Sequence, residues 1–470
     1  MSSRPIPLRA PGRTGSPTQR GQALLLALML LFAGTLGLYL MFSAGQVLAT
    51  RQRLNNAADA AAYSAAVWRA RVMNYQAYAN RAIVAQEVAV AQAVTLVSWA
   101  RYFQAFAGTA SALSAAYPPV ATVLAVSREL AADASELAQM AAGEEIVARA
   151  AHARLLAAGQ ELMQLAVGTF AAGAVANEVA RANDPRFFAF ALGGDGGPLA
   201  SRPYEADDRA RLREVVTGSL DPFVGGPRGL DMTLLPLPSL CFGNPIAGPG
   251  SWFNELRKRG GTVMAPDLER WEAADTHSLH THVPRHGFLG LFRGCRLTEA
   301  LPLGWGAAEA GGSGTGEGAG VLQADPGGTR LNGSATALAE ADSAARPVPG
   351  LSAYPGLPVV RDLDYPALPD SRFPISRVAV LARTQGADAR TAAALNVGTG
   401  RLRLTERFAG GRLWSLASAE VYFRRPPAAP NEDPALAERI EYASLYSPYW
   451  QARLAEPTEA ERALAQGYAR

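Results

Sequence analysis

Lysine is almost absent from this chain of 470 residues. Lys258 is the only one, so arginine supplies 43 of the 44 basic residues (44 − 1). Its position excludes a Walker phosphate-binding loop and a Ser-x-x-Lys nucleophile, because each motif needs a lysine at a fixed place. There is no Gly-x-Ser-x-Gly elbow either. The formal net charge of +3 is small for this length and provides no general attraction for nucleic acid. We therefore expect no enzyme, no cofactor and no nucleic-acid partner.

Cysteine is nearly as rare, with only Cys241 and Cys295 present. Between them lie 53 residues (294 − 242 + 1). In an oxidising compartment the two can form a disulfide bond, which on the chain-entropy model stabilises a loop of this length by about 4 kcal/mol. The alternative is a pair of buried free thiols.

Charge is absent from Gly21 to Thr50, and Ala23 to Phe42 forms an apolar block. About 20 helical residues span the hydrocarbon core of a bilayer, so this segment predicts one transmembrane helix. The arm before it carries four arginines and no acid: Arg4, Arg9, Arg13 and Arg20. The positive-inside rule then predicts a cytoplasmic N-terminus and a periplasmic body, with the protein in the inner membrane.

Two other readings of this segment remain open. Small residues at 43–45 and 47–49 stand at plausible cleavage spacing for a signal peptide, although the apolar block is longer than a usual signal core. A core helix of a soluble protein is the other alternative. We expect an uncleaved anchor.

A long helix is predicted to follow the anchor. Arg51 to Tyr117 contains no proline and a single glycine, Gly108. Ala57, Ala61 and Ala65 recur every fourth residue, which places them on one side of the helix and lets another helix approach closely. We expect this face to pack against a partner helix; the alternative is an Ala-rich helix with no dedicated partner.

A second helical region is predicted from about Val120 to Asn183, between Pro118-Pro119 and Asp184-Pro185. The two regions can fold back on each other as an antiparallel hairpin. The stretch from Tyr102 to Ser127 also lacks charge, but its polar residues and its central prolines argue against a second membrane span.

These N-terminal residues resemble a known family. Arg20-Gly21-Gln22-Ala23-Leu24, the apolar span, and then Arg51-Gln52-Arg53-Leu54-Asn55-Asn56-Ala57-Ala58-Asp59-Ala60-Ala61-Ala62 are similar to the N-terminal domain of Flp pilus-assembly proteins of the TadG (TadE/TadG) type. The resemblance covers about residues 20–66. It implies a single-pass inner-membrane component of the tight-adherence pilus machinery without catalytic activity.

One departure from the pilin pattern refines this expectation. Prepilins of this system are cleaved after a glycine and carry glutamate at the fifth mature position, whereas cleavage after Gly21 would place Leu26 there. A permanently anchored accessory protein fits better than a polymerising subunit. No Asp-x-Ser-x-Ser metal-site motif marks a von Willebrand-type domain in the body.

After Asp184 the composition shifts to glycine, proline and aromatics, which predicts strands and loops. Candidate strands are 375–384, 401–405 and 420–423, with a turn at Gly410-Gly411, and they predict an antiparallel sheet of at least three strands. The Gly-, Ser- and Ala-rich stretch 306–346 is predicted to be a flexible loop or linker.

Two cap signals predict short helices near the C-terminus: Asp433-Pro434, and the capping box Thr458-Glu459-Ala460-Glu461. Between them, the four aromatic residues of 442–450 either pack against the body or form an exposed partner site. We expect packing.

Four of the five histidines lie between His277 and His286. His280 and His282 would share one face of a strand, as two zinc ligands do. No His-Glu-x-x-His pattern accompanies them. Metal binding and a metal-free surface or interface segment rich in histidine are both open.

The sequence as a whole predicts an α+β protein: a transmembrane helix, a long Ala-rich helix, a helical hairpin and a mainly antiparallel β body. The expected regions are an arm (1–20), an anchor (21–50), a helical region (51–184), the first part of the body (185–305), the loop (306–346), a β part (347–430) and a helical tail (431–470). An assembly or scaffold protein ranks first, a membrane-tethered binding or adhesion module second, and a metal-dependent envelope enzyme third. The expected partners are the membrane and other inner-membrane or pilus-assembly proteins, in an oligomeric state that the sequence leaves open.

Overall fold

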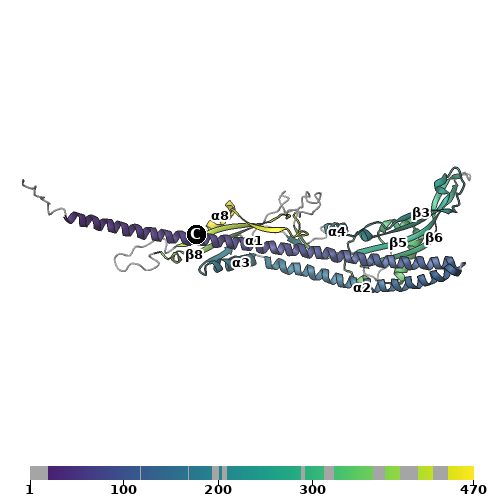
Figure 1. Cartoon of the computed structure of the whole chain (residues 1–470), viewed down its shortest axis with the longest axis horizontal. Coiled ribbons are helices and arrows are strands. Elements are labelled where there is room, and N and C mark those ends of the chain that lie inside the picture. The colour runs from purple at the N-terminus through teal and green to yellow at the C-terminus, as the bar shows by residue number, and fades with distance from the viewer. Residues whose placement is uncertain are drawn as a thin grey trace, which may run out of the picture.

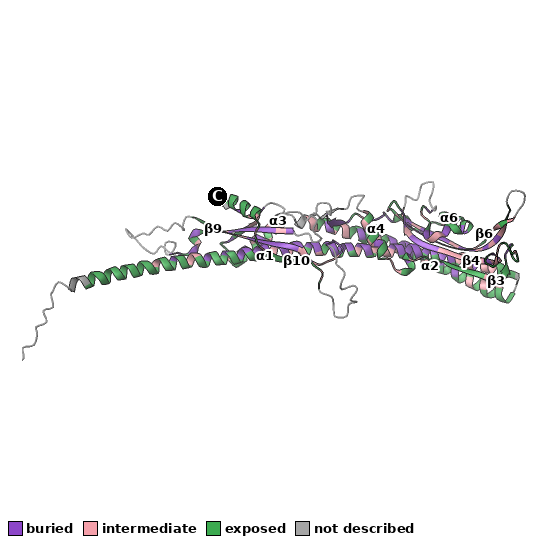
Figure 2. Ribbon diagram, turned by 90° about the horizontal axis from the view of Figure 1, so that it is seen from above, coloured by how far each residue is buried: buried purple, intermediate pink, exposed green. Residues whose placement is uncertain are grey.

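One helix forms the spine of the molecule. The computed structural model describes residues 20–116, 118–167, 169–192, 201–203, 209–286, 292–311, 322–363, 376–391, 411–426 and 443–469. Helix α1 (Arg20–Leu113) is 94 residues long, about 140 Å at the usual helical rise. Its N-terminal part extends alone, whereas the rest is covered by the other elements (Figures 1 and 2). The predicted continuation of the apolar helix into the Ala-rich helix is confirmed.

The predicted helical hairpin is also confirmed. After the 3-10 turn η2 (Ser114–Ala116), helix α2 (Pro118–Val167) runs back along α1 (Figure 1). Prolines suit the first turn of a helix, where the missing N–H has no intrahelical acceptor. Helix α3 (Thr169–Asn183) continues in the same direction and packs on α1 nearer the anchor.

Four antiparallel strands cover the end of α1 farthest from the anchor, and we call them the distal sheet. They are β3 (Leu230–Pro238), β4 (Phe253–Met264), β5 (Arg270–His286) and β6 (Phe292–Gly311), paired in chain order. A second sheet, the proximal sheet, lies on α1 nearer the anchor. Its antiparallel order is β1 (Phe188–Ala191), β8 (Ser376–Gln385), β9 (Arg412–Phe423) and β10 (Trp450–Ala455).

Shorter elements complete the fold. Strands β2 (Ser201–Pro203) and β7 (Arg361–Leu363) pair with each other. The remaining helices are α4 (Arg209–Gly218), α5 (Pro222–Gly225), α6 (Gly333–Ala345) and α8 (Glu459–Ala469), and the 3-10 turns are η4 (Pro249–Ser251), η6 (Pro326–Leu331), η7 (Leu351–Ala353) and η9 (Gly386–Ala389). The predicted capping box is present at α8: the Thr458 N–H donates to Glu461, and the Glu461 N–H donates to the Thr458 hydroxyl.

Two separate hydrophobic cores form along the same helix. The proximal core joins residues 54–73 of α1 to α3 and to the inner face of the proximal sheet. The distal core joins residues 83–97 of α1 to α2, α4 and the distal sheet. Because both cores use α1, its middle and distal parts are buried on several sides (Figure 2).

The predicted flexible loop at 306–346 is wrong for the residues that the structure describes there. Residues up to Gly311 belong to β6, and 333–345 form α6, whose Ala335 and Ala339 are fully buried. The error has a physical cause: Gly306 allows a close approach of α1. A Cβ at that position would lie 2.2 Å from the Ser98 carbonyl oxygen. At Gly306, therefore, glycine permits tight packing against α1.

The predicted helical tail at 431–470 is partly wrong, because 450–455 form strand β10. The predicted strand at 401–405, Gly410 and the Asp433-Pro434 cap lie outside the described residues. In the aromatic segment Tyr446 and Trp450 are buried, as expected for packing against the body.

Candidate functional site

The first candidate site is the bare N-terminal part of α1. Its most apolar stretch has a mean hydropathy of 2.3 and none of it is buried in the protein. Leu24 to Phe32 expose their side chains, Leu31 by 70 %. Such a surface is unfavourable in water and favourable in lipid, and a helix satisfies its own backbone hydrogen bonds there. Among the described residues, one helix is long and apolar enough to cross a membrane, and that helix is α1.

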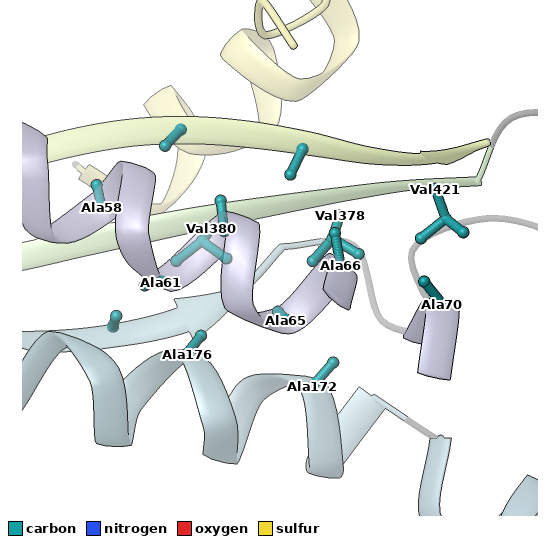
Figure 3. Packing of buried hydrophobic residues seen from close by; sticks show 14 of the residues in the cluster. Ala58, Ala61, Ala65, Ala66, Ala70, Ala172, Ala176, Val378, Val380 and Val421 are labelled. Atoms are coloured by element: carbon teal, nitrogen blue, oxygen red, sulfur yellow. The ribbon is translucent and has the colours of Figure 1, made fainter. Parts of the chain in front are cut away.

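The alanine face of α1 begins where the bare part ends. Ala57, Ala61 and Ala65 are fully buried, as are Ala58, Ala62 and Ala66. Figure 3 shows Ala61 and Ala65 on the side of α1 that faces α3, whose Ala172 and Ala176 are also fully buried. Small side chains on both helices allow this close packing.

This arrangement corrects the predicted partner. A helix does pack on the alanine face, but it is α3 of the same chain, and the proximal sheet covers the neighbouring row. The periodicity located a close helix contact. It contained no information on whether the second helix came from this chain or from another protein.

Polar side chains fix α1 to the proximal sheet. The Asn74 amide donates to the Trp450 carbonyl oxygen at 2.9 Å and accepts from the Trp450 N–H at 3.0 Å. The Arg69 guanidinium donates to the carbonyl oxygen of Arg377 at 3.3 Å. These bonds set the register between helix and sheet, which apolar contacts alone leave free to slide.

A buried charge cluster fixes α1 to the distal sheet. Asp275 on β5 is completely buried and accepts hydrogen bonds from the Ser98 hydroxyl (3.0 Å) and from two nitrogens of Arg228 (2.9 and 2.8 Å). Lys258 lies 3.3 Å from the same carboxylate and 4.9 Å from the centre of the Tyr102 ring. The carboxylate is thus paired with cations and fully hydrogen-bonded, as a buried charge requires.

Two further polar groups of α1 enter the distal interface. Arg101 is buried and donates to the carbonyl oxygens of Ala307 (2.9 Å) and Arg346. Glu87 accepts a hydrogen bond of 2.5 Å from the Tyr354 hydroxyl. Burial raises the pKa of Glu87 to about 7, and the bond from Tyr354 offsets part of that rise. Sequence analysis missed both groups, although Glu87 and Arg101 are 14 residues apart (101 − 87), which is twice seven and places them on one helix face.

The histidine segment lies in β5, where His280 and His282 are buried and His286 is exposed. His280 is 2 % exposed, and its Nε2 lies 2.8 Å from the Asn332 side-chain oxygen. His282 is 9 % exposed, and its Nδ1 lies 3.2 Å from the Phe253 carbonyl oxygen. His277 stacks on Phe106 at the junction with α1, and burial lowers its pKa. Within the described ranges, no three His, Cys, Asp or Glu side chains come together as a metal site.

Cys241 and Cys295 are joined by a disulfide bond, with their Cα atoms 6.6 Å apart. The bond connects the loop after β3 to the start of β6, at the end of the distal sheet. Its closed loop contains the whole of β4 and β5, and therefore the histidine segment.

Together these features define a helix-spined α+β protein with a bare apolar helical extension and two sheet lobes docked on one helix. Residues 21–70 match the family described as putative Flp pilus-assembly TadE/G-like, which confirms the predicted resemblance and associates the chain with Flp pilus assembly. The matched segment contains both the bare apolar helix and the whole alanine face. No curated protein and no solved structure matches the chain.

Proposed function

We propose that this protein is a non-enzymatic, single-pass inner-membrane component of the Flp pilus-assembly apparatus. Its N-terminus is cytoplasmic and its body periplasmic. This orientation agrees with the arm before the apolar segment, in which the only charged side chains are arginines. It acts as a scaffold that meets other pilus-assembly proteins in or near the membrane.

One observation carries the proposal. The apolar extension and the spine of both lobes are a single uninterrupted helix. A continuous helix has no flexible joint between the membrane segment and the lobes. The position of the membrane segment therefore determines where both lobes stand above the membrane. A scaffold needs that property, whereas a tethered enzyme with a mobile linker does not.

The buried polar groups also support a role without chemistry. Asp275, Glu87 and His280 each have hydrogen-bond partners within the chain and hold elements together. Dialysed full-length protein should retain no stoichiometric zinc, as measured by elemental analysis. Zinc retained at one ion per chain and lost in His280→Ala and His282→Ala would favour the metal-dependent alternative.

Complementation tests the requirement for the anchor. In cells lacking the protein, the full chain should restore surface pili, whereas the same body exported behind a cleavable signal peptide should not. A C-terminal reporter should be active only in the periplasm, and the full-mass protein should stay in the inner-membrane fraction. Full restoration by the released body, or a mature N-terminus near residue 46 or 50, contradicts the proposal.

Photo-crosslinking tests the partners. A crosslinking residue at Leu137 on the exposed side of α2 or at the exposed Tyr63 should capture pilus-assembly proteins in cells. The same residue at Leu54, a fully buried larger side chain of the same core, is the matched control and should crosslink only within the chain. Capture of a pilus protein from Leu54 would restore the partner role that the sequence predicted for this part of α1.

A further inference from the structure

The end of the distal sheet carries an exposed apolar loop. No residue from Met232 to Asn254 is charged. In this loop Leu240 is 70 %, Phe242 57 % and Ile246 76 % exposed. Clusters of this kind mark an interaction surface, because water disfavours them and the sheet beside them already has its own core.

The loop is held in place. Phe242 packs edge-on against Trp252 and Phe253, and the Trp252 indole N–H donates to the Asn244 carbonyl oxygen at 3.1 Å. The Cys241 disulfide fixes it to β6. Its apolar side chains are therefore presented by an ordered support, which lowers the entropy cost of binding.

Arginines lie beside this loop, on the ends of β5 and β6. No residue from Thr276 to Thr298 is acidic. The stretch contains Arg285, Arg293 and Arg296, all exposed. They lie beside the disulfide, since Arg285 pairs in register with Gly294 and Val283 with Arg296. Among the described residues, none of the three forms an ion pair with an acid.

This surface lies far from the anchor. It is at the opposite end of the molecule from residues 20–50 in both views (Figures 1 and 2). The helix from Thr50 to Leu113 alone covers about 95 Å. At the same end, the turn between α1 and α2 is uncharged from Tyr102 to Ser127, and Leu113 and Val123 are exposed.

We propose that this distal tip, formed by the loop 239–246 with Arg285, Arg293 and Arg296, docks on the anionic phospholipid surface of a second bilayer. Exposed Leu, Phe and Ile side chains enter the boundary between headgroups and acyl chains, and arginines bind the phosphates. The positive charge of the three arginines is complementary to the negative charge of that surface. The distance from the anchor excludes the bilayer that holds α1 when the spine stands upright.

The test uses the full chain reconstituted in phosphatidylcholine vesicles. These are mixed with labelled protein-free vesicles of phosphatidylcholine alone or with phosphatidylglycerol, and capture is measured by co-sedimentation. Three arginines at an anionic surface should raise the affinity for the mixed vesicles on the order of a hundredfold over the neutral ones. Added salt should reduce this preference.

Two variants separate the contributions. Leu240→Ser, Phe242→Ser and Ile246→Ser together should abolish capture, and Arg285→Gln, Arg293→Gln and Arg296→Gln together should remove the preference for anionic vesicles. The matched control changes exposed leucines of α2, Leu130→Ser, Leu137→Ser and Leu155→Ser, and should capture like the wild type. Disulfide formation in each variant reports that the distal sheet has folded.

Several results would overturn the proposal. Absence of capture, equal capture of neutral and anionic vesicles, or equal loss in the α2 control each contradicts it. Capture that requires protein on both vesicle populations assigns the tip to a second copy of the chain instead. No pilus component is present in this assay, so its failure leaves the proposed scaffold function standing, and failed complementation leaves this proposal standing.

Discussion

Asn74 on α1 and Trp450 at the start of β10 exchange two hydrogen bonds through the Asn74 amide and the Trp450 backbone, 376 residues apart in sequence. A side chain of the spine thus takes the place of a neighbouring strand. Trp450 also lies in the proximal core and is 3 % exposed, so both of its backbone groups are away from water.

Asn74→Ala should therefore lower the free energy of unfolding by about 1 to 3 kcal/mol, because it leaves a buried donor and a buried acceptor unpaired. Denaturant unfolding of the full chain in detergent, followed by tryptophan fluorescence, measures the change. Asn56→Ala, at an exposed position of the same helix, is the control and should change stability by less than about 0.5 kcal/mol. Equal effects of the two substitutions would contradict the assigned role of Asn74.

Ala61→Leu should destabilise the isolated full chain by roughly 1 to 3 kcal/mol, because a larger side chain cannot fit between α1 and its buried neighbours without strain. Leu and Ala have similar helix propensities, so the loss reports packing. Ala148→Leu, at an exposed position of α2, is the matched control. Unchanged stability with lost pilus assembly would mean that Ala61 meets another protein after all.

Glu87 should make the protein less stable as the pH rises. Its folded pKa of about 7 lies above the ordinary value of 4.5 because of burial, so the folded state binds a proton that the unfolded state has already released. The contribution is fully present below pH 4.5 and is lost as the pH rises to about 7. The shift corresponds to about 3 kcal/mol.

Glu87→Gln removes this titration and keeps a neutral side chain. The difference between the unfolding free energies of wild type and variant should therefore change by that amount between pH 4.5 and about 7. Taking this difference cancels the contribution of the histidines, which both proteins contain. Glu136→Gln on the exposed side of α2 is the control. A constant difference between the Glu87→Gln and wild-type curves would show that Glu87 does not titrate in this window.

The Cys241–Cys295 bond should be present in exported protein. Thiol alkylation under denaturing conditions should modify neither cysteine before reduction and both after it. On the chain-entropy model, Cys241→Ser with Cys295→Ser should cost about 4 kcal/mol, since the bonded cysteines are separated by 54 positions in the sequence. Two reactive cysteines without reductant would refute the bond.

Local pattern determined the helical half of this protein. The uncharged apolar block, the proline-free run to Tyr117 and the Thr458–Glu461 capping box each depend on neighbours within a few residues, and each forms the predicted element. The family resemblance rests on the same contiguous stretch, residues 21–70. Helix propensity and hydrophobicity are short-range properties, so the sequence alone contains them.

Tertiary structure decided how those elements are used. The alanine face predicted close packing, but only the fold shows that α3 and the proximal sheet fill it. Gly306 begins the stretch that was predicted to be a flexible loop, but α1 crosses it, with the Ser98 carbonyl oxygen in the space that a side chain would occupy. Asp275 gains its role from Ser98 and Arg228, which lie 177 and 47 residues away in the chain. Such contacts depend on which distant surfaces meet, and no periodicity within a single segment encodes that choice.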